Sequence, residues 1–227
     1  VFFKELKIRK PDYNLNIGSK KNEHFHQLAN LSIKIIELFR KKKIKPDCIV
    51  FLGDSNSVSS AISLKKEGYK IAHIEAGMRS YDKRMLEEIN RTVCDYCSDL
   101  NFVYHDDYKK NLLKENIHKN NIYVVGNTIK EVAKDYSKKF LKIPKKNNFI
   151  LADIHRPENF LYKDRLEKIV KLLNDYSAEF KIPVYLLNFK RTSDMLKYFQ
   201  IKIHNIKLID LMSYNDFLNN QYHSFLI

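Results

Sequence analysis

Residues 46–67 read PDCIVFLGDSNSVSSAISLKKE, an apolar run followed by a Gly-Asp pair and a stretch with helical periodicity. Every residue from 48 to 52 is apolar, which is typical of a strand that helices cover on both faces. A strand joined to a helix by a short turn is the repeating unit of proteins built around parallel sheets. The segment therefore predicts an α/β fold.

The same alternation continues along the rest of the chain. Apolar runs predict further strands at 70–74, 100–104, 122–125, 148–152, 183–187 and 207–209. Helical periodicity predicts helices at 1–8, 30–42, 58–67, 86–98, 106–116, 129–140, 162–177, 193–199 and 214–221. A lysine-rich stretch between the strands that end near 125 and begin at 148 marks a domain boundary. We expect two doubly wound, Rossmann-like domains, at 1–127 and 128–227.

The composition is that of a folded protein with a strongly basic surface. Hydrophobic residues make up 44% of the 227 residues, and the net charge is +14. The lysines are spread over predicted loops and helix ends without a nucleic-acid-binding motif, so we expect a solvated surface and no nucleic-acid partner. No apolar run approaches the roughly 18 residues that cross a bilayer, and no leader peptide opens the chain. We therefore expect a cytoplasmic protein that does not contact a membrane.

The cysteines predict neither a disulfide nor a metal site. The chain has 3 cysteines, and Cys94 and Cys97 lie within one predicted helix. An odd number is typical of free thiols in a reducing compartment. The Cys-x-x-Cys spacing matches a redox motif, but no second pair accompanies it as a zinc site would require. We expect two ordinary helix residues and no bound metal.

Acidic residues follow the first predicted strands at the points where those strands end. Asp54 comes after the first strand, Glu75 directly follows the second, and Glu87 lies in the first turn of the next helix. Two of them have an ordinary alternative, since Asp54 can cap a helix and Glu87 can pair with Arg91 four residues later. Ligands bind beyond the carboxyl ends of parallel strands, so carboxylates that converge there favour acid–base chemistry. His73, inside the second strand, is expected to be structural.

The second half of the chain has a comparable polar cluster. The sequence His-Arg-Pro-Glu-Asn follows a predicted strand at 155–159. An imidazole and a guanidinium both suit phosphate groups, although Arg156 can instead pair with Glu158. The position of His155 at the end of a strand matches that of the acidic residues in the first half. His155 therefore lies at the equivalent edge of the second sheet, where it could either bind a phosphate or carry a proton.

Taken together, these segments resemble the non-hydrolysing UDP-N-acetylglucosamine 2-epimerases. The similar motifs occur in order along the chain: a strand ending in Gly-Asp at 46–54, His-x-Glu-Ala-Gly-x-Arg at 73–79, Glu-Glu-x-Asn-Arg at 87–91, Gly-Asn-Thr at 126–128, His-Arg-x-Glu-Asn at 155–159, and an aromatic pair at Tyr214 and Phe217. The resemblance implies a GT-B-like fold of two Rossmann-like domains, as in many glycosyltransferases.

The resemblance also implies a reaction and the residues that perform it. Such enzymes eliminate UDP across C1–C2 of UDP-N-acetylglucosamine and add it back after reprotonation of C2 from the other face, without a cofactor. The acid–base roles would fall to Asp54, Glu75 and Glu87. Substrate binding would fall to Arg91, to Arg156, to His155 at the diphosphate and to Phe217 at the uracil. The resemblance further implies a homodimer that acts on a UDP-N-acetylhexosamine to supply polysaccharide precursors.

The chain departs from the family pattern, and alternatives stay open. The family's Gly-Thr-Arg-Pro-Glu and Ser-Gly-Gly loops would lie before Val1 and after Ile227, so the resemblance implies a chain truncated at both ends, with two incomplete domains and an incomplete site. Leu86 stands where the family usually has proline, and Asn188 begins what is commonly a His-Pro pair. The alternatives are a hydrolysing 2-epimerase, a 2,3-diacetamido-sugar 2-epimerase and a non-catalytic nucleotide-sugar-binding module.

Overall fold

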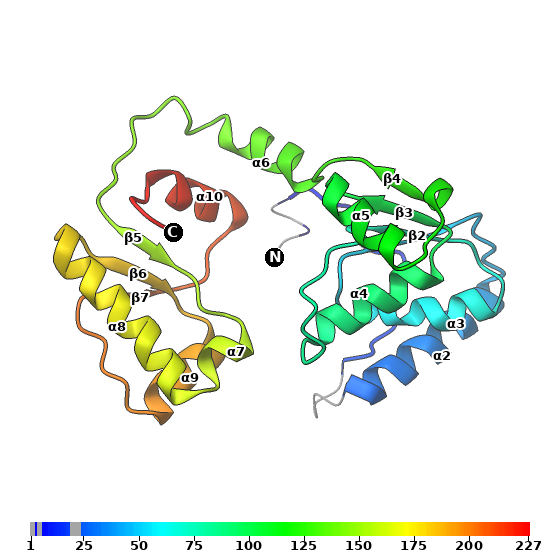
Figure 1. The fold of residues 1–227 in the computed structure, drawn as a ribbon, viewed down its shortest axis with the longest axis horizontal. Coiled ribbons are helices and arrows are strands. Elements are labelled where there is room, and N and C mark those ends of the chain that lie inside the picture. Colours follow the sequence, from blue (N-terminus) through cyan, green and yellow to red (C-terminus); the bar gives the residue numbers. More distant parts are fainter. Residues whose placement is uncertain (1–2, 4–5, 19–23) are drawn as a thin grey trace. The chain divides into compact units, whose positions relative to one another are not determined.

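The computed structural model describes residues 3, 6–18 and 24–227, and these form two compact units (Figure 1). The N-terminal unit comprises Lys10–Lys130, and the C-terminal unit comprises Glu131–Ile227 together with the described residues before Lys10. The predicted helix at 1–8 lies largely outside the described residues. The domain limits of 1–127 and 128–227 stay a prediction.

A parallel sheet organises the N-terminal unit. Its strands are, in spatial order, β1 (Ile49–Leu52), β2 (Ile71–Ile74), β3 (Leu100–Val103) and β4 (Ile122–Val124). Leu52 pairs with Ile74, and Ile74 pairs with Phe102, so neighbouring strands end at the same edge of the sheet. The loops that follow the strands therefore gather at this carboxyl edge.

Helices cover one face of this sheet. They are α2 (His24–Lys42), the 3₁₀ turn η1 (Asn56–Ser60), α3 (Ala61–Lys66), α4 (Leu86–Cys97) and α5 (Asp106–Lys114), with η2 (Lys119–Asn121) before β4. Figure 1 shows α2, α3 and α4 together on one side of the strands. The core between these helices and the sheet includes Val58, Leu64 and Cys94. Helix α5 begins where the His105 side chain accepts a hydrogen bond from the Asp107 backbone N–H.

Strand β1 lacks the two covered faces that its apolar sequence predicts. Ile49 and Phe51 pack against the helical core, whereas Val50 and Leu52 on the opposite face are exposed among the described residues. Successive side chains of a strand point to opposite faces, so one half of an apolar strand can pack while the other half does not. The apolar run predicted the strand correctly, but the prediction of cover on its second face was wrong.

A second parallel sheet organises the C-terminal unit, in the order β5 (Ile150–Ala152), β6 (Val184–Leu187) and β7 (Ile206–Ile209). Its helices are α7 (Pro157–Phe160), α8 (Lys163–Phe180), α9 (Lys190–Tyr198) and α10 (Tyr214–His223), and α6 (Ile129–Ser137) crosses into it from the first unit. Figure 1 shows α8 and α10 on opposite sides of these strands. Leu186 lies in the core on the α8 side, and Leu187 lies in the core on the α10 side. Both faces of this sheet are therefore covered.

The predicted α/β class and the parallel sheets are confirmed. Each predicted strand is present, with ends that shift by at most two residues. Helix α2 begins at His24 rather than at residue 30, and α9 begins at Lys190 rather than at 193. The sequence did not predict α7, in which Pro157 occupies the first turn, where a missing N–H leaves no hydrogen bond unmade. Within the described ranges, no helix is both long enough and apolar enough to span a bilayer.

Candidate active site

The turn at Gly53 and Asp54 follows β1 at the carboxyl edge of the N-terminal sheet. Gly53 has φ +77°, a left-handed conformation that glycine adopts without a steric penalty. Its N–H donates to the carbonyl of Ile74 (3.1 Å), so the turn stays attached to β2. Asp54 does not cap the following helix, because Ser55 is the N-cap residue of η1. The Asp54 carboxylate therefore lies at the sheet edge, with 32% of its side chain exposed.

Glu75 follows β2 with a strained backbone. Its φ is +76°, which non-glycine residues rarely adopt, at a strain of about 1–3 kcal/mol. The N–H groups of Glu75 and Ala76 both donate to the carbonyl of Phe102 (3.1 and 3.2 Å), which holds the turn against β3. Gly77 completes the turn at φ +75°, where an added Cβ would lie 2.5 Å from the Tyr108 carbonyl oxygen. These contacts together fix the turn that carries the Glu75 side chain.

Arg91 of α4 joins the two acidic residues. Its Nη2 donates to Asp54 Oδ2 (2.5 Å) and to Glu75 Oε1 (2.9 Å), so one guanidinium nitrogen holds both carboxylates. The Arg91 side chain is only 8% exposed, and charged hydrogen bonds are stronger away from water. Asn90 anchors the same turn by donating from Nδ2 to the Asp54 carbonyl oxygen (2.9 Å). Two of the three predicted carboxylates therefore lie together.

Glu87, the third predicted carboxylate, is not part of this ion pair. It is exposed in the first turn of α4. In the described structure the ion pairs of Arg91 are with Asp54 and Glu75, so the alternative pairing of Glu87 with Arg91 is not formed. The i, i+4 spacing allows Arg91 to pair with Glu87, but Arg91 instead pairs with two carboxylates from loops that are distant in sequence.

Glu88 is the buried acid of the same helical turn. It accepts hydrogen bonds from the N–H and hydroxyl of Ser80 (2.8 and 3.0 Å) and from the N–H of Tyr81 (3.0 Å). Burial raises the pKa of Glu88, but these hydrogen bonds and the charge of Arg79 lower it overall. Glu88 thereby fixes the loop that follows Gly77. Sequence analysis placed Glu88 in the helix but gave it no role.

A pocket of about 560 Å³ opens at the carboxyl edge of the N-terminal sheet. Its lining comes from the end of β1, from the loops that follow β2, β3 and β4, and from the first turns of α5 and α6: Leu52, Glu75, Met78, Tyr104, His105, Tyr108, Asn127, Thr128 and Ile129. The volume and the largely apolar lining are typical of a small-molecule site. The hydroxyls of Tyr104 and Thr128 lie 3.1 Å apart and add polar groups beside the Glu75 carboxylate. Neither tyrosine was predicted as a site residue, although Tyr104 follows β3 as Glu75 follows β2, and Tyr108 lies in the first turn of α5.

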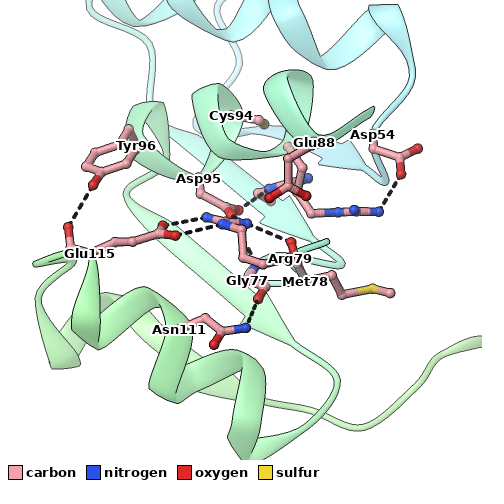
Figure 2. A network of polar contacts seen from close by, with 12 residues as sticks. Asp54, Gly77, Met78, Arg79, Glu88, Cys94, Asp95, Tyr96, Asn111 and Glu115 are labelled. Atoms are coloured by element: carbon pink, nitrogen blue, oxygen red, sulfur yellow. Dashed lines mark hydrogen bonds and ion pairs between the residues drawn. The ribbon is translucent and has the colours of Figure 1, made fainter. Parts of the chain in front are cut away.

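A buried network of charged groups lies beside these turns (Figure 2). His73, inside β2, is completely buried, and its Nδ1 lies 2.6 Å from Asp95 Oδ1 while its Nε2 lies 2.7 Å from the Gly53 carbonyl oxygen. Asp95 also accepts from the Gly77 N–H (3.1 Å) and pairs with Arg79 (2.8 Å). The structural role predicted for His73 is confirmed. Its partner Asp95 was missed because it lies in the last turn of α4, far from His73 in sequence.

Arg79 extends this network toward α5. Its Nε and Nη2 donate to the two oxygens of Glu115 (2.8 and 2.6 Å), as Figure 2 shows. Burial alone would lower the pKa of Arg79, but the hydrogen bond to Glu115 and the charge of Asp95 raise it overall. The loop between β2 and α4 is therefore tied to both α4 and α5.

The candidate residues of the C-terminal unit follow β5 or lie in α10. His155 is exposed, and its Nδ1 lies 2.6 Å from Asp153 Oδ1. Arg156 is exposed beside it as the N-cap residue of α7. The buried Oε2 of Glu158 has no hydrogen-bond partner among the described residues, so this oxygen does not bind Arg156. Phe217 is partly buried against the core on the α10 side of the sheet.

The cysteines are free, as predicted. Burial raises the pKa of Cys94 to about 12 and also raises the pKa of Cys97. Thiols react as thiolates, so neither residue has the activated thiol of a redox motif. In the part of the chain that the structure describes, no group of three or more His, Cys, Asp or Glu side chains is arranged to bind a metal.

The fold and the site define a class of protein. Two α/β units with parallel sheets are typical of Rossmann-like proteins, which bind ligands beyond the carboxyl ends of the strands, and the paired carboxylates lie at that edge of one sheet. The sequence profile of the family described as UDP-N-acetylglucosamine 2-epimerase matches residues 1–227, and the chain belongs to this family.

Known relatives agree with this assignment. The UDP-N-acetylglucosamine 2-epimerase of Methanococcus maripaludis is 36% identical over 243 residues, covering 100% of this chain and 65% of the relative. The UDP-2,3-diacetamido-2,3-dideoxy-D-glucuronate 2-epimerase of Pseudomonas aeruginosa is 32% identical, covering 94% of this chain and 60% of the relative. The chain therefore spans less than two thirds of the length of these relatives.

A solved structure gives the same result for the fold. The crystal structure of Methanocaldococcus jannaschii UDP-GlcNAc 2-epimerase in complex with UDP-GlcNAc and UDP matches with a TM-score of 0.82 at 35% identity. The match covers 95% of this chain and 62% of that one. The predicted GT-B-like fold with Rossmann-like units is confirmed.

Proposed function

We propose that the full-length gene product inverts C2 of a UDP-linked N-acetylhexosamine and so interconverts UDP-N-acetylglucosamine and UDP-N-acetylmannosamine. The observation that carries the proposal is the carboxylate pair, in which Arg91 holds Asp54 next to Glu75 at the pocket. Membership of the family supports the same reaction, as does the UDP-GlcNAc bound to the relative from Methanocaldococcus jannaschii.

Inversion at C2 needs a base and an acid that act on opposite faces of the sugar. The base removes the C2 proton, the C2–H electron pair becomes a C1=C2 double bond, and the C1–O bond breaks with its electrons leaving on UDP. In the return step the UDP oxygen bonds to C1 again while the acid delivers a proton to C2 from the other face. The sequence is redox-neutral, and each positioned acid or base contributes about 10²–10⁴-fold to the rate.

We assign the proton transfers to Asp54, Glu75 and Glu87. Glu75 lines the pocket, and Asp54 binds the same Arg91 guanidinium as Glu75. Both carboxylates are therefore placed to reach a sugar bound in the pocket. Glu87 offers an exposed carboxylate at the start of α4. Arg91 offsets the repulsion between Asp54 and Glu75, which is strong away from bulk water.

For the nucleotide we propose the candidate residues of the C-terminal unit. His155 and Arg156 are exposed and adjacent after β5, where sheets of this class bind ligands, and both suit a diphosphate. Phe217 offers a partly exposed ring on α10, which suits stacking on uracil.

Isotope exchange tests the proposed reaction. The full-length gene product is incubated with UDP-N-acetylglucosamine in deuterated water, and the products are followed by proton NMR and mass spectrometry. We expect deuterium at C2 of both UDP-sugars with the UDP linkage intact. Accumulation of free N-acetylmannosamine and UDP would identify a hydrolysing enzyme instead. Binding of UDP-N-acetylglucosamine without exchange would identify a non-catalytic module, and either result would overturn the proposal.

A 2,3-diacetamido sugar is the second candidate substrate. The relative from Pseudomonas aeruginosa, named for such a substrate, is 32% identical to this chain and favours this reading. Parallel assays with the UDP-linked 2,3-diacetamido uronic acid and with UDP-N-acetylglucosamine decide between the two. The substrate with the higher kcat/KM for C2 exchange is the one the pocket selects.

The setting of the reaction is also a proposal. We infer a homodimer that works in the cytoplasm and supplies nucleotide sugars for polysaccharide synthesis. The free cysteines support a reducing compartment, and the nucleotide-sugar substrate is one used for building polysaccharides. Sedimentation of the purified protein and fractionation of the cells that make it test the dimer and the location.

A further inference from the structure

We propose that His73 is held in its doubly protonated form and, together with Arg91, positions Asp54 relative to Glu75. The proposal rests on the catalytic roles proposed for these two carboxylates. His73 itself is completely buried and does not line the pocket, so it does not contact a substrate there. It is a positioning residue rather than a catalytic one.

The hydrogen-bond partners of His73 determine its protonation. The Gly53 carbonyl oxygen, 2.7 Å from Nε2, can only accept a hydrogen bond. Asp95 Oδ1, 2.6 Å from Nδ1, belongs to a carboxylate whose other oxygen already accepts from the Gly77 N–H and pairs with Arg79. An ionised carboxylate is also only an acceptor. Both ring nitrogens must therefore donate, which defines the imidazolium.

The charges around His73 support the imidazolium. Positive His73, negative Asp95, positive Arg79 and negative Glu115 follow one another through short contacts of 2.6, 2.8 and 2.6 Å. The net charge of these four side chains is zero only when His73 is protonated, and unpaired buried charges are strongly unfavourable. Asn101, the neighbour of His73 on β3, adds no charge, and neither does Cys94, because burial raises the pKa of its thiol to about 12.

His73 fixes the turn that carries Asp54. The Gly53 N–H donates to the Ile74 carbonyl (3.1 Å), and the Gly53 carbonyl accepts from His73 Nε2, so adjacent residues of β2 hold both sides of Gly53. A glycine at φ +77° has many other accessible conformations, and these two hydrogen bonds remove them. Asp54 is the next residue.

The same imidazolium is linked to the turn that carries Glu75. Asp95, which His73 binds through Nδ1, also binds the N–H of Gly77 in that turn (Figure 2). The turns after β1 and β2 are thus joined through one His73–Asp95 pair. Misplacing a catalytic group by about 1 Å can lower a rate by about 10²-fold, so the spacing that this pair sets is sufficient to control the rate.

The first experiment reads the protonation state without any activity. The full-length gene product is labelled with ¹⁵N-histidine, and long-range ¹H–¹⁵N correlation spectra are recorded at neutral pH, with His73 assigned by loss of its signal in His73→Gln. We expect two equivalent, protonated ring nitrogens. One protonated and one unprotonated nitrogen would overturn the proposal. Because the readout needs no turnover, it does not depend on the epimerase assignment.

The second experiment separates the two hydrogen bonds of His73. The Gln amide in His73→Gln can reach the Nε2 position and keep a donor to the Gly53 carbonyl, whereas the shorter Asn amide in His73→Asn can reach only the Nδ1 position and face Asp95. We expect kcat for C2 exchange to fall by about 10²-fold in His73→Asn and by less in His73→Gln, with KM changed by less than about threefold in both. His118→Gln, at an exposed histidine of the same unit, should match wild type.

Three results would count against a positioning role. Equal losses of kcat in the two variants, or losses confined to KM, would show that His73 contributes only packing or substrate affinity. Exchange without loss in His73→Asn would also overturn the proposal. If both variants unfold, the spectrum of the wild-type ring decides, with His73 then assigned by through-space contacts of its ring protons to the backbone amides of Ala72 and Ile74. If the wild type shows imidazolium but no C2 exchange, the proposed function fails while the protonation state stands.

Discussion

Replacing Arg91 with methionine should destabilise the protein and strongly slow exchange at C2. Methionine keeps an unbranched stem but removes the guanidinium that binds Asp54 at 2.5 Å and Glu75 at 2.9 Å. Removing one partner of a buried ion pair costs about 3–5 kcal/mol. Asp54 and Glu75 are 32% and 26% exposed, so water screens part of the repulsion left behind. We therefore expect the free energy of unfolding to fall by about 2 kcal/mol.

The assay is urea unfolding of the full-length gene product, followed by circular dichroism, with C2 exchange measured in parallel. Arg40→Met is the matched control, because Arg40 pairs with Glu67 (2.8 Å) on the surface of the same unit. Exposed ion pairs contribute about 0–1 kcal/mol, so this variant should stay close to wild type in stability and exchange. Exchange in Arg91→Met should fall by about 10²-fold or more, because neither carboxylate keeps its position.

A compensating variant tests the reasoning directly. Adding Asp54→Asn and Glu75→Gln to Arg91→Met removes both negative charges, so stability should return to within about 1 kcal/mol of wild type while exchange does not recover. A further loss of stability in this triple variant would show that charge repulsion is not what Arg91 offsets. The reasoning is also refuted if Arg91→Met alone unfolds at the wild-type urea concentration.

Three further predictions follow from the site. Gly77→Ala should lower the free energy of unfolding by about 3 kcal/mol or more, because the added Cβ would lie 2.5 Å from the Tyr108 carbonyl oxygen. Gly126→Ala, at a similar φ but with nothing within 4 Å, should lower it by only about 1 kcal/mol, and equal losses in urea unfolding would contradict this. The pKa of Glu88 is lowered in the folded state, so wild type should be more stable than Glu88→Gln at any pH above 4.5, the pKa of the unfolded state. This difference in the free energy of unfolding should shrink as the pH falls below that pKa. Urea unfolding that gives the same difference at pH 7 and pH 3 would argue against it. Because the pKa of Cys94 is raised to about 12, its alkylation by iodoacetamide at pH 8 should be far slower in the native protein than in urea, as mass spectrometry of the labelled peptide would show, and similar rates would count against the buried thiol.

Much of the fold could be predicted from the sequence because strand and helix periodicity is a local signal. The runs that became β1 and β6 are apolar at nearly every position, and each is followed by a helix. The edge of the sheet where Asp54 and Glu75 meet also followed from order alone, since consecutive parallel strands end at the same side. What the apolar runs could not show was which faces are covered. Val50 and Leu52 are as apolar as Ile49 and Phe51 but lie exposed among the described residues.

The contacts of the site were harder to predict because they join residues far apart in sequence. The spacing of Glu87 and Arg91 allows a helical ion pair, yet Arg91 turns toward Asp54 and Glu75 instead. No local pattern links His73 in a strand to Asp95 in the last turn of a helix. Such partners depend on how α4 packs against the sheet, and a single sequence does not specify that packing angle.

The left-handed backbone at Glu75 has a consequence for protein engineering. Glycine and asparagine adopt this conformation more easily than glutamate, so either substitution would relieve part of a strain of about 1–3 kcal/mol. A library screened for heat resistance alone would therefore enrich Glu75→Gly or Glu75→Asn and, with them, protein that has lost the carboxylate proposed to carry a proton. Thermostable variants of this chain should be sought with position 75 held constant.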